Sequence, residues 1–502
     1  MKYDIINLIL GNERTRIMNS IKRTLLIALS LILLFTTLTA CNEEPSDTVG
    51  TESKSIESSS EATPLTERNN YGDDFHMVIQ RNSNNMTYYW VEESNNDALS
   101  EAVFDRQQKV FDYLGVDIIA SESLGHDQYG APFMNSVKNK DGAIDSLLSH
   151  AYMSLPAFIQ EGYLLDFKDV DRINLEADHW GIDVMEGVAT GDHLYLGYSN
   201  FRLAHTMAIT YNKKMMDQYS DALEESIYDT VRGYRWTIDK MISIANLVYV
   251  DKTSDGKTVD DTFGITGRQW VPFVNFMQAS NINLVSLNEK GSYVVSVYDE
   301  INKARTATLT DKLLELAKSD CSWFNYIPIP TEELNITCGR TLLSVEQIVE
   351  LPKYLSFDVE FGIIPYPMFD EAQKDVGYRS LDWGGWICIP SYTDDLNMVA
   401  DTLEVLSFYS EDVKVTFYEK LLGKQVAEAP EDREMLDMIW DSICSDMGLT
   451  YSHIDGSLDN NLYLLPRVTY ANTSEQLASF VRSYETVANK KLKKFFEIIS
   501  KQ

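Results

Sequence analysis

The segment Asp382-Trp383-Gly384-Gly385-Trp386 places two indole rings next to a carboxylate, with a glycine pair between the rings. Flat aromatic rings suit the apolar face of a saccharide, and acidic or amide side chains suit its rim of hydroxyls. Glycine also lets the backbone approach another group closely. The segment therefore predicts a carbohydrate-binding loop that uses Asp382, Trp383 and Trp386. The alternative is that both indoles pack in the interior.

Short motifs of enzyme chemistry are missing from the sequence. It contains no HExxH, no phosphate-binding P-loop, no GxSxG and no GxGxxG. We therefore predict a binding protein without a cofactor rather than an enzyme. Glycoside hydrolysis needs only a pair of carboxylates and has no short motif, so a lipid-anchored glycoside hydrolase remains the alternative. A sugar-sensing or adhesin lipoprotein is the third possibility.

The N-terminal region has the pattern of a bacterial lipoprotein signal. Lys22 and Arg23 precede an uncharged, Leu-rich run at residues 24–36, and Leu38-Thr39-Ala40-Cys41 resembles the lipobox. We expect residues 1–40 to be removed and Cys41 to carry the lipid, on the extracellular face of the cell membrane. The alternative, an uncleaved transmembrane anchor, has an apolar run that is short for a bilayer. Met1 and Met18 both remain possible start sites.

The chain is strongly acidic, with 43 Lys and Arg against 76 Asp and Glu and a net charge of −33. Such a surface repels phosphate backbones, which excludes nucleic acid as a partner. The cysteines after the anchor match no zinc spacing. Cys321 and Cys338 are the nearest pair for one disulfide, and four reduced core cysteines are the alternative.

Hydrophobic spacing predicts alternating strands and helices after a polar tether. Residues 41–70 are rich in Ser, Thr and Glu, which predicts a disordered tether. A strand at 75–79, a helix at 98–114 ending before Gly115, and a strand at 116–119 form a β-α-β start. Further predicted elements are a helix-strand unit at 141–149, a strand at 207–210 followed by a helix, a helix at 238–248 capped by Thr237, strands at 361–365 and 386–390, and a helix at 473–500.

Several segments, in order, resemble the extracellular solute-binding proteins of bacterial ABC importers, in particular the sugar-binding, maltose-binding-protein-like family 1. The segments that carry the resemblance are Asn96-Asp97-Ala98-Leu99 with Arg106, then Leu114-Gly115-Val116, Phe158 to Phe167, Ala208-Ile209-Thr210-Tyr211-Asn212-Lys213, Trp236-Thr237-Ile238-Asp239, Phe361 to Pro367 and Trp386 to Pro390. Trp236 we interpret as a packing residue at a helix start rather than as a ligand contact.

The resemblance implies an α/β, two-lobe periplasmic-binding-protein-like fold of type II, with the ligand cleft between the lobes. It also implies a small-molecule solute, with a saccharide favoured, ABC permease subunits as partners, and a monomer. The expected organisation is a signal peptide at 1–40, a tether at 41–70, lobe 1 at 71–212, lobe 2 at 213–383, a return to lobe 1 at 384–425, and a return to lobe 2 with C-terminal helices at 426–502.

By position in the family, further residues are expected to face the cleft. They come from loops after predicted strands, where open α/β sheets bind their ligands. The candidates are Trp90, His150, Tyr152, Arg202, Arg268, Trp270, Glu346 and Gln347.

An acidic loop at residues 251–262 resembles an incomplete calcium-binding loop. Asp251, Asp255 and Gly256 match required positions, and Asp260 adds a carboxylate, but the last position is Thr262 rather than Glu. We therefore assign no metal site and regard an acidic surface turn as the better interpretation.

Overall fold

The computed structural model of the chain describes residues 63–65, 67–80, 86–95, 97–123, 130–203, 205–254, 256–268, 271–325, 334–422, 430–454 and 474–501. The predicted signal segment and the lipid anchor at Cys41 lie outside these ranges. Within them, no helix has the length and apolar composition needed to cross a membrane. The described residues belong to one compact unit.

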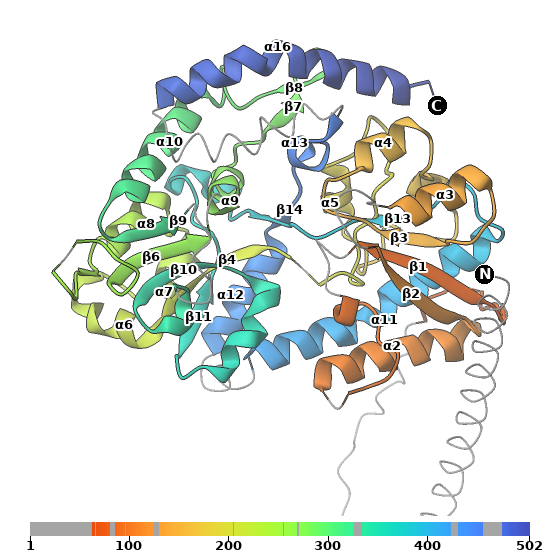
Figure 1. Cartoon of the computed structure of the whole chain (residues 1–502), viewed down its shortest axis with the longest axis horizontal. Coiled ribbons are helices and arrows are strands. Elements are labelled where there is room, and N and C mark those ends of the chain that lie inside the picture. Colours follow the sequence, from red (N-terminus) through yellow and green to blue (C-terminus); the bar gives the residue numbers. More distant parts are fainter. Residues whose placement is uncertain are drawn as a thin grey trace, which may run out of the picture. The chain divides into compact units, whose positions relative to one another are not determined.

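The first sheet is built from the N-terminal strands and has the order β13-β3-β1-β2 (Figure 1). β1 pairs in parallel with β2 and β3, while β13 pairs antiparallel with β3. This confirms the predicted β-α-β start. The strands are β1 (Asp74–Gln80), β2 (Asp117–Ser123), β3 (Ser146–Leu148) and β13 (Ile387–Cys388); the helices packed around them are α2 (Ala98–Leu114), α3 (Ala131–Asn139), α4 (Leu155–Gln160), α5 (Ile182–Glu186) and α11 (Leu396–Leu422).

Helix α2 shows how local sequence sets an element. The Asp97 side chain accepts from the backbone N–H of Ser100, and Gly115 ends the helix in the left-handed region at φ 66°. Inside the helix, the fully buried Arg106 donates to the Tyr89 carbonyl and to Ser410 Oγ on α11. Its guanidinium lies over the ring of Phe201, 4.8 Å from the centroid. The buried guanidinium thus connects α2 to α11 and to the segment that precedes α2.

The second sheet has the order β11-β4-β10-β6-β5, with β9 also pairing with β6. β4 runs antiparallel to both β10 and β11, whereas β10, β6 and β9 are parallel. The strands are β4 (Met207–Asn212), β5 (Tyr249–Val250), β6 (Thr262–Arg268), β9 (Ser322–Asn325), β10 (Thr341–Gln347) and β11 (Phe361–Ile364); the helices around them are α6 (Lys213–Gln218), α7 (Ile227–Arg232), α8 (Ile238–Ala245), α9 (Val271–Ala279), α10 (Lys303–Lys318) and α12 (Pro430–Asp441).

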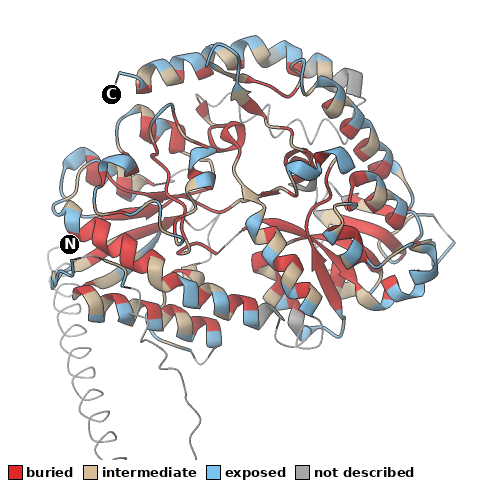
Figure 2. Cartoon of the chain, turned by 180° about the vertical axis from the view of Figure 1, so that it is seen from behind, coloured by how far each residue is buried: buried red, intermediate tan, exposed pale blue. Residues whose placement is uncertain are grey.

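Two sequence predictions about helix starts in this region are confirmed. Thr237 caps α8, because its hydroxyl accepts from the N–H of Lys240. Trp236 is fully buried and its indole N–H donates to the carbonyl of Pro365 at 2.8 Å, as expected for a packing residue. Figure 2 shows that the strands of both sheets are largely buried, except the edge strands β2 and β5, whose residues are mostly intermediate or exposed.

Smaller elements complete the chain. β12 (Ser380–Leu381) pairs in parallel with β14 (Ile443–Cys444), and β7 (Val285–Leu287) forms a hairpin with β8 (Tyr293–Val295). The remaining helices are α13 (Met447–Thr450) and α16 (Ser474–Ile499), and 3-10 turns occupy Met86–Tyr88, Phe167–Asp169, Ser220–Ala222, Ile336–Cys338, Ile348–Ser356 and Glu371–Asp375.

Some predicted elements differ from the structure in position. The helix expected within 141–149 lies earlier, at Ala131–Asn139, and only the strand falls in that range. Part of the expected tether is also structured, because Arg68 Nε donates to the Tyr113 carbonyl at 2.6 Å. β4, which the predicted boundary at 212 would place in lobe 1, pairs in the second sheet. The lobe boundaries themselves stay predictions.

Candidate functional site

A buried polar cluster is centred on the two segments that connect the sheets, one before β4 and one between β12 and β13, and includes one residue from the segment before α2. We call it the crossing cluster; its members are Tyr89, Tyr198, Arg202, His205 and Asp382. The side chains of Arg202 and Asp382 are 1% and 5% exposed and lie 3.1 Å apart, Nη2 to Oδ1. Tyr198 OH donates to Asp382 Oδ2 at 3.0 Å. The fold therefore brings together Arg202 and Asp382, two of the residues that the sequence analysis selected.

The Arg202–Asp382 pair is ionised despite its burial. Burial raises the pKa of Asp382, but Arg202, His205, the Gly384 N–H and the Tyr198 hydroxyl together hold it below its ordinary value. Burial lowers the pKa of Arg202, but Asp382, Tyr198 and Tyr89 together raise it above its ordinary value. The position of Gly384 is tight: a Cβ there would lie 1.7 Å from Arg202 Nη2, so this glycine makes room for the guanidinium.

His205 joins the ion pair to the second sheet. Its Nε2 lies 3.1 Å from Tyr89 OH. Its backbone carbonyl accepts from Gln347 Nε2 at 3.2 Å and from the N–H of Trp383 at 3.4 Å. Burial lowers the pKa of the His205 imidazole to about 4, so it is neutral at pH 7.

The buried neutral His205 predicts a pH-dependent stability. An unfolded histidine gains a proton below about pH 6.5, whereas His205 in the folded state gains one only near pH 4. The unfolded state thus binds more protons in this window, so stability falls as the pH decreases through it. Between pH 7 and pH 5, the free energy of unfolding should fall by about 2 kcal/mol more in the wild type than in His205→Gln.

Urea unfolding at both pH values measures this difference. Comparing His205→Gln with the wild type cancels the other titrating groups, such as Asp145, whose pKa burial raises to about 6. The same comparison between pH 7 and pH 8 should give almost no difference. An equal loss in both proteins between pH 7 and pH 5 would contradict the assignment of a neutral His205.

The two tryptophans of the crossing segment have different environments. Trp386 is 4% exposed, and its indole N–H donates to the Ala151 carbonyl at 3.1 Å. Its edge packs against Tyr198, with ring centroids 6.3 Å apart. Trp383 is partly exposed and donates to Asn275 Oδ1 on α9 at 3.1 Å. Interior packing therefore describes Trp386, while Trp383 keeps solvent-accessible surface for a ligand.

Tyr152 and His150 follow the carboxyl end of β3, as the sequence analysis expected. His150 is buried, and its ring meets that of Tyr152 in an edge-to-face arrangement, with ring centroids 4.6 Å apart. Tyr152 is partly exposed and stacks on His453, with centroids 5.2 Å apart and planes at 22°. Tyr152 thus lies close to the crossing segment, since Ala151 beside it accepts the Trp386 indole N–H.

The other predicted residues divide between the site and the interior. Gln347 ends β10 and bonds to His205, next to Trp383. Glu346 is buried and accepts from Tyr354 OH at 3.1 Å, and Trp90 donates its indole N–H to the Ile118 carbonyl at 2.8 Å. Arg268 ends β6, where its backbone is in register with Asn325. Trp270 lies outside the described residues.

Sequence reasoning did not select Tyr89, His205, Asn275 or His453. Tyr89 adjoins the selected Trp90, and His205 lies just before the selected crossing strand, so their positions offered a signal. Asn275 is 108 residues away from its partner Trp383, and no local pattern links them. His453 likewise follows a region without family landmarks.

The acidic loop and the cysteines show no metal or disulfide chemistry among the described residues. The Asp251 carboxylate accepts from the backbone N–H groups of Thr253 at 3.2 Å, Ser254 at 2.6 Å and Gly256 at 3.2 Å, which is a turn-forming role. Asp260 is described and exposed, whereas Asp255 lies outside the described residues. Within the described part of the chain, no grouping of three side chains could hold a metal ion, and the cysteines at 321, 338, 388 and 444 are free thiols.

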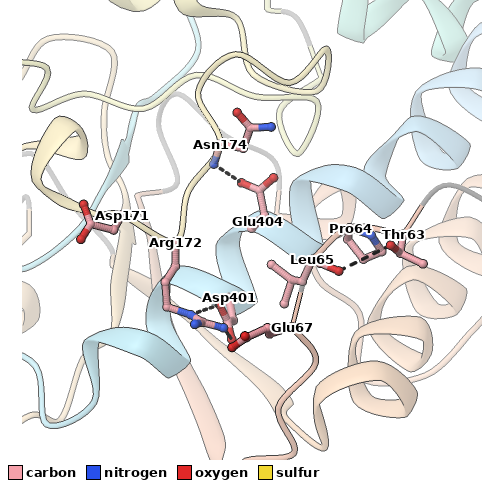
Figure 3. Close-up of a pocket in the computed structure, with 9 residues that line it drawn as sticks. All are labelled: Thr63, Pro64, Leu65, Glu67, Asp171, Arg172, Asn174, Asp401 and Glu404. Atoms are coloured by element: carbon pink, nitrogen blue, oxygen red, sulfur yellow. Dashed lines mark hydrogen bonds and ion pairs between the residues drawn. The ribbon is translucent and has the colours of Figure 1, made fainter.

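A separate pocket of about 530 Å³ lies where the described chain begins (Figure 3). Three of its charged groups have hydrogen-bond partners in the lining: Arg172 Nη2 donates to Asp401 Oδ2 at 2.6 Å, and Glu404 accepts from the Asn174 N–H at 3.2 Å. The pocket contains none of the predicted site residues. Its lining consists of Thr63, Pro64, Leu65, Glu67, Asp171, Arg172, Asn174, Asp401 and Glu404.

Comparisons with known proteins place the fold. No family model and no curated protein matches the chain. The GacH receptor of Streptomyces glaucescens, solved unliganded and with acarbose, aligns over 84% of this chain and 98% of its own, with 14% identity and a TM-score of 0.54. The galacto-N-biose-/lacto-N-biose I-binding protein of an ABC transporter from Bifidobacterium longum aligns over 84% of this chain and 97% of its own. The identity is 13% and the TM-score is 0.54.

A third example is the maltose/maltodextrin-binding domain MalE from Bdellovibrio bacteriovorus, bound to maltotriose. It aligns over 86% of this chain and 100% of its own, with 13% identity and a TM-score of 0.51. Each of these structures is a binding protein or receptor. The resemblance drawn from short sequence segments is therefore confirmed at the level of the fold: the chain has the α/β, maltose-binding-protein-like fold of type II periplasmic binding proteins.

Proposed function

We propose that this chain, which has the fold described above, is the substrate-binding receptor of an ABC importer and that it captures an extracellular carbohydrate. The observation that carries the proposal is the placement of Trp383. This residue, whose indole is partly exposed, lies on the segment that connects the two sheets, and its backbone N–H shares the His205 carbonyl with Gln347. Solved proteins of this fold bind acarbose, lacto-N-biose and maltotriose.

The arrangement suits binding of a polyhydroxylated ring. The indole of Trp383 offers an apolar surface for one face of a sugar, and the amide of Gln347 can both donate and accept hydrogen bonds at its rim. The ion pair of Arg202 with Asp382, next to Trp383 in the sequence, holds this segment in place. In this fold the two lobes close by rotation about the connecting segments, which shields a bound ligand from water.

The carboxylates near Trp383 favour binding over hydrolysis. A glycosidase needs one carboxylic acid that stays protonated near neutral pH, so its pKa must be raised. Asp382 has a lowered pKa and is paired with Arg202. Glu346 is buried and accepts from Ser344 Oγ and Tyr354 OH, which makes it a structural group.

The same proposal includes the location and the delivery of the ligand. A lipid on Cys41 would hold the receptor on the extracellular face of the cell membrane, and the tether would give it reach. The closed, ligand-bound form would be the state that the permease subunits recognise, because the ligand shifts the population towards it. The acidic surface and the lipobox-like segment support this part of the proposal.

A thermal-shift screen tests the proposed function. The panel contains monosaccharides, maltotriose, lacto-N-biose, mannotriose and, as a class control, di- and tripeptides. A saccharide that binds only the native state should raise Tm, by several degrees at a concentration 100 times its Kd. A shift with peptides alone, or release of reducing sugar by the purified protein, would overturn the proposal.

A further inference from the structure

The C-terminal part of the chain forms an arm, which we define as residues 443–454 together with α16. The arm bonds to the end of α5 on the side of the first sheet. Ser445 Oγ donates to the Val184 carbonyl at 2.7 Å, and Tyr451 OH donates to the Val188 carbonyl at 2.6 Å. The Val184 carbonyl is among the last of α5, which lack partners within the helix, so the Ser445 hydroxyl supplies one, while Val188 lies just after the helix. α16 also packs against α4 on this side.

The same arm is attached more firmly to the side of the second sheet. The buried Asp446 carboxylate accepts from the N–H of Leu284 at 3.0 Å and from Gln278 Nε2 of α9 at 2.7 Å. Phe496 of α16 stacks on Tyr293 of β8, with centroids 4.2 Å apart. α16 also packs against α10, and Figure 1 shows it running along β7 and β8. The Val295 N–H of β8 also donates to Asn489 Oδ1 of α16 at 2.7 Å, so the arm makes more contacts on this side than on the first.

The arm also touches the proposed ligand site. His453 stacks on Tyr152, which follows the carboxyl end of β3 and lies next to Ala151, the acceptor for Trp386. Tyr152 also meets His150 in an edge-to-face arrangement, with ring centroids 4.6 Å apart. A ligand ring that stacked on the face of Tyr152 covered by His453 would need the arm to move away.

We infer that the arm is a strap that spans both lobes and gates the ligand site. It stays on the second lobe and releases α5, α4 and Tyr152 when the lobes separate, because it makes fewer contacts with the first lobe: two hydroxyl bonds, the stack on Tyr152 and the packing of α16 on α4. Ligand entry and exit therefore require strap release, and His453 leaves Tyr152 in the same step. The inference deepens the proposed function. The first of its two tests rests on that function, because it measures the binding rates of a saccharide.

A reversible cross-link tests the gate. A Cβ added to Gly187 would lie 3.6 Å from Ser445 Cβ, within the range of disulfides, and Gly187 has φ −60°, which any residue adopts. In Gly187→Cys/Ser445→Cys, oxidation should slow association and dissociation of the best saccharide of the screen at least tenfold. Dithiothreitol should restore both rates. The matched control, Ser445→Cys alone, should not respond to oxidation. Rates that oxidation leaves unchanged would overturn the gate.

A second measurement needs no ligand. Nitroxide labels on Lys138→Cys in α3 and Lys493→Cys in α16, both exposed positions, report the distance between the first lobe and the strap. We expect a main distance and a longer minor population, which grows at least threefold when Ser445→Ala and Tyr451→Phe remove the two hydroxyls. A single distance in both proteins would overturn the strap. If no saccharide binds, the proposed function falls while this measurement still decides the strap.

Discussion

Replacing Asp382 with Ala should lower the free energy of unfolding by about 3–5 kcal/mol, because it leaves the Arg202 guanidinium buried without its carboxylate. The loss combines the missing attraction with the desolvation of an uncompensated charge. Urea unfolding at pH 7 measures it. The Arg202→Met/Asp382→Leu double variant, which removes both charges, should lose much less than the single variant, since apolar replacement of a buried pair is often neutral.

A surface ion pair provides the matched control. Glu225 pairs with Arg235 in a more exposed setting, with side chains 26% and 44% exposed. Glu225→Ala should cost less than about 1 kcal/mol, because solvent screens such pairs. Equal losses in Asp382→Ala and Glu225→Ala would show that Arg202 reaches solvent in the folded state, and would contradict the buried cluster.

Replacing Trp383 with Ala should weaken saccharide binding by about 1–3 kcal/mol, or roughly tenfold to a hundredfold, while the protein remains folded. The reason is its partly exposed indole at the crossing segment. Trp386→Ala should act differently. Removal of its buried ring should cost about 3–5 kcal/mol of stability, because it leaves a cavity beside Tyr198. Calorimetric titration and urea unfolding of both variants separate the two effects.

Trp440 on α12 serves as the control for Trp383. It is also partly buried, packs against Tyr418 at 4.8 Å, and belongs to none of the site segments. Trp440→Ala should leave the saccharide affinity unchanged. If Trp383→Ala binds as tightly as the wild type, the indole does not contact the ligand and the site assignment is wrong, although the fold is not affected.

The fold class could be predicted because its signals are local or ordered along the chain. Asp97 and Gly115 bound α2, Thr237 caps α8, and the β-α-β start follows from apolar spacing. Each of these depends on contacts between residues a few positions apart. Family-like segments in the right order then indicated the two-lobe architecture. The lipid anchor, the permease partners and the lobe boundaries remain predictions.

Sequence alone thus determined many of the elements, since capping and hydrophobic periodicity act over three or four residues. Only the tertiary structure decided which tryptophan is exposed. The Trp386 indole donates to the carbonyl of Ala151, which lies 235 positions earlier in the chain. The Trp383 indole donates to Asn275, 108 positions earlier. Burial depends on all neighbours in space, and the packing of distant segments is what separates two indoles that look equivalent in Asp-Trp-Gly-Gly-Trp.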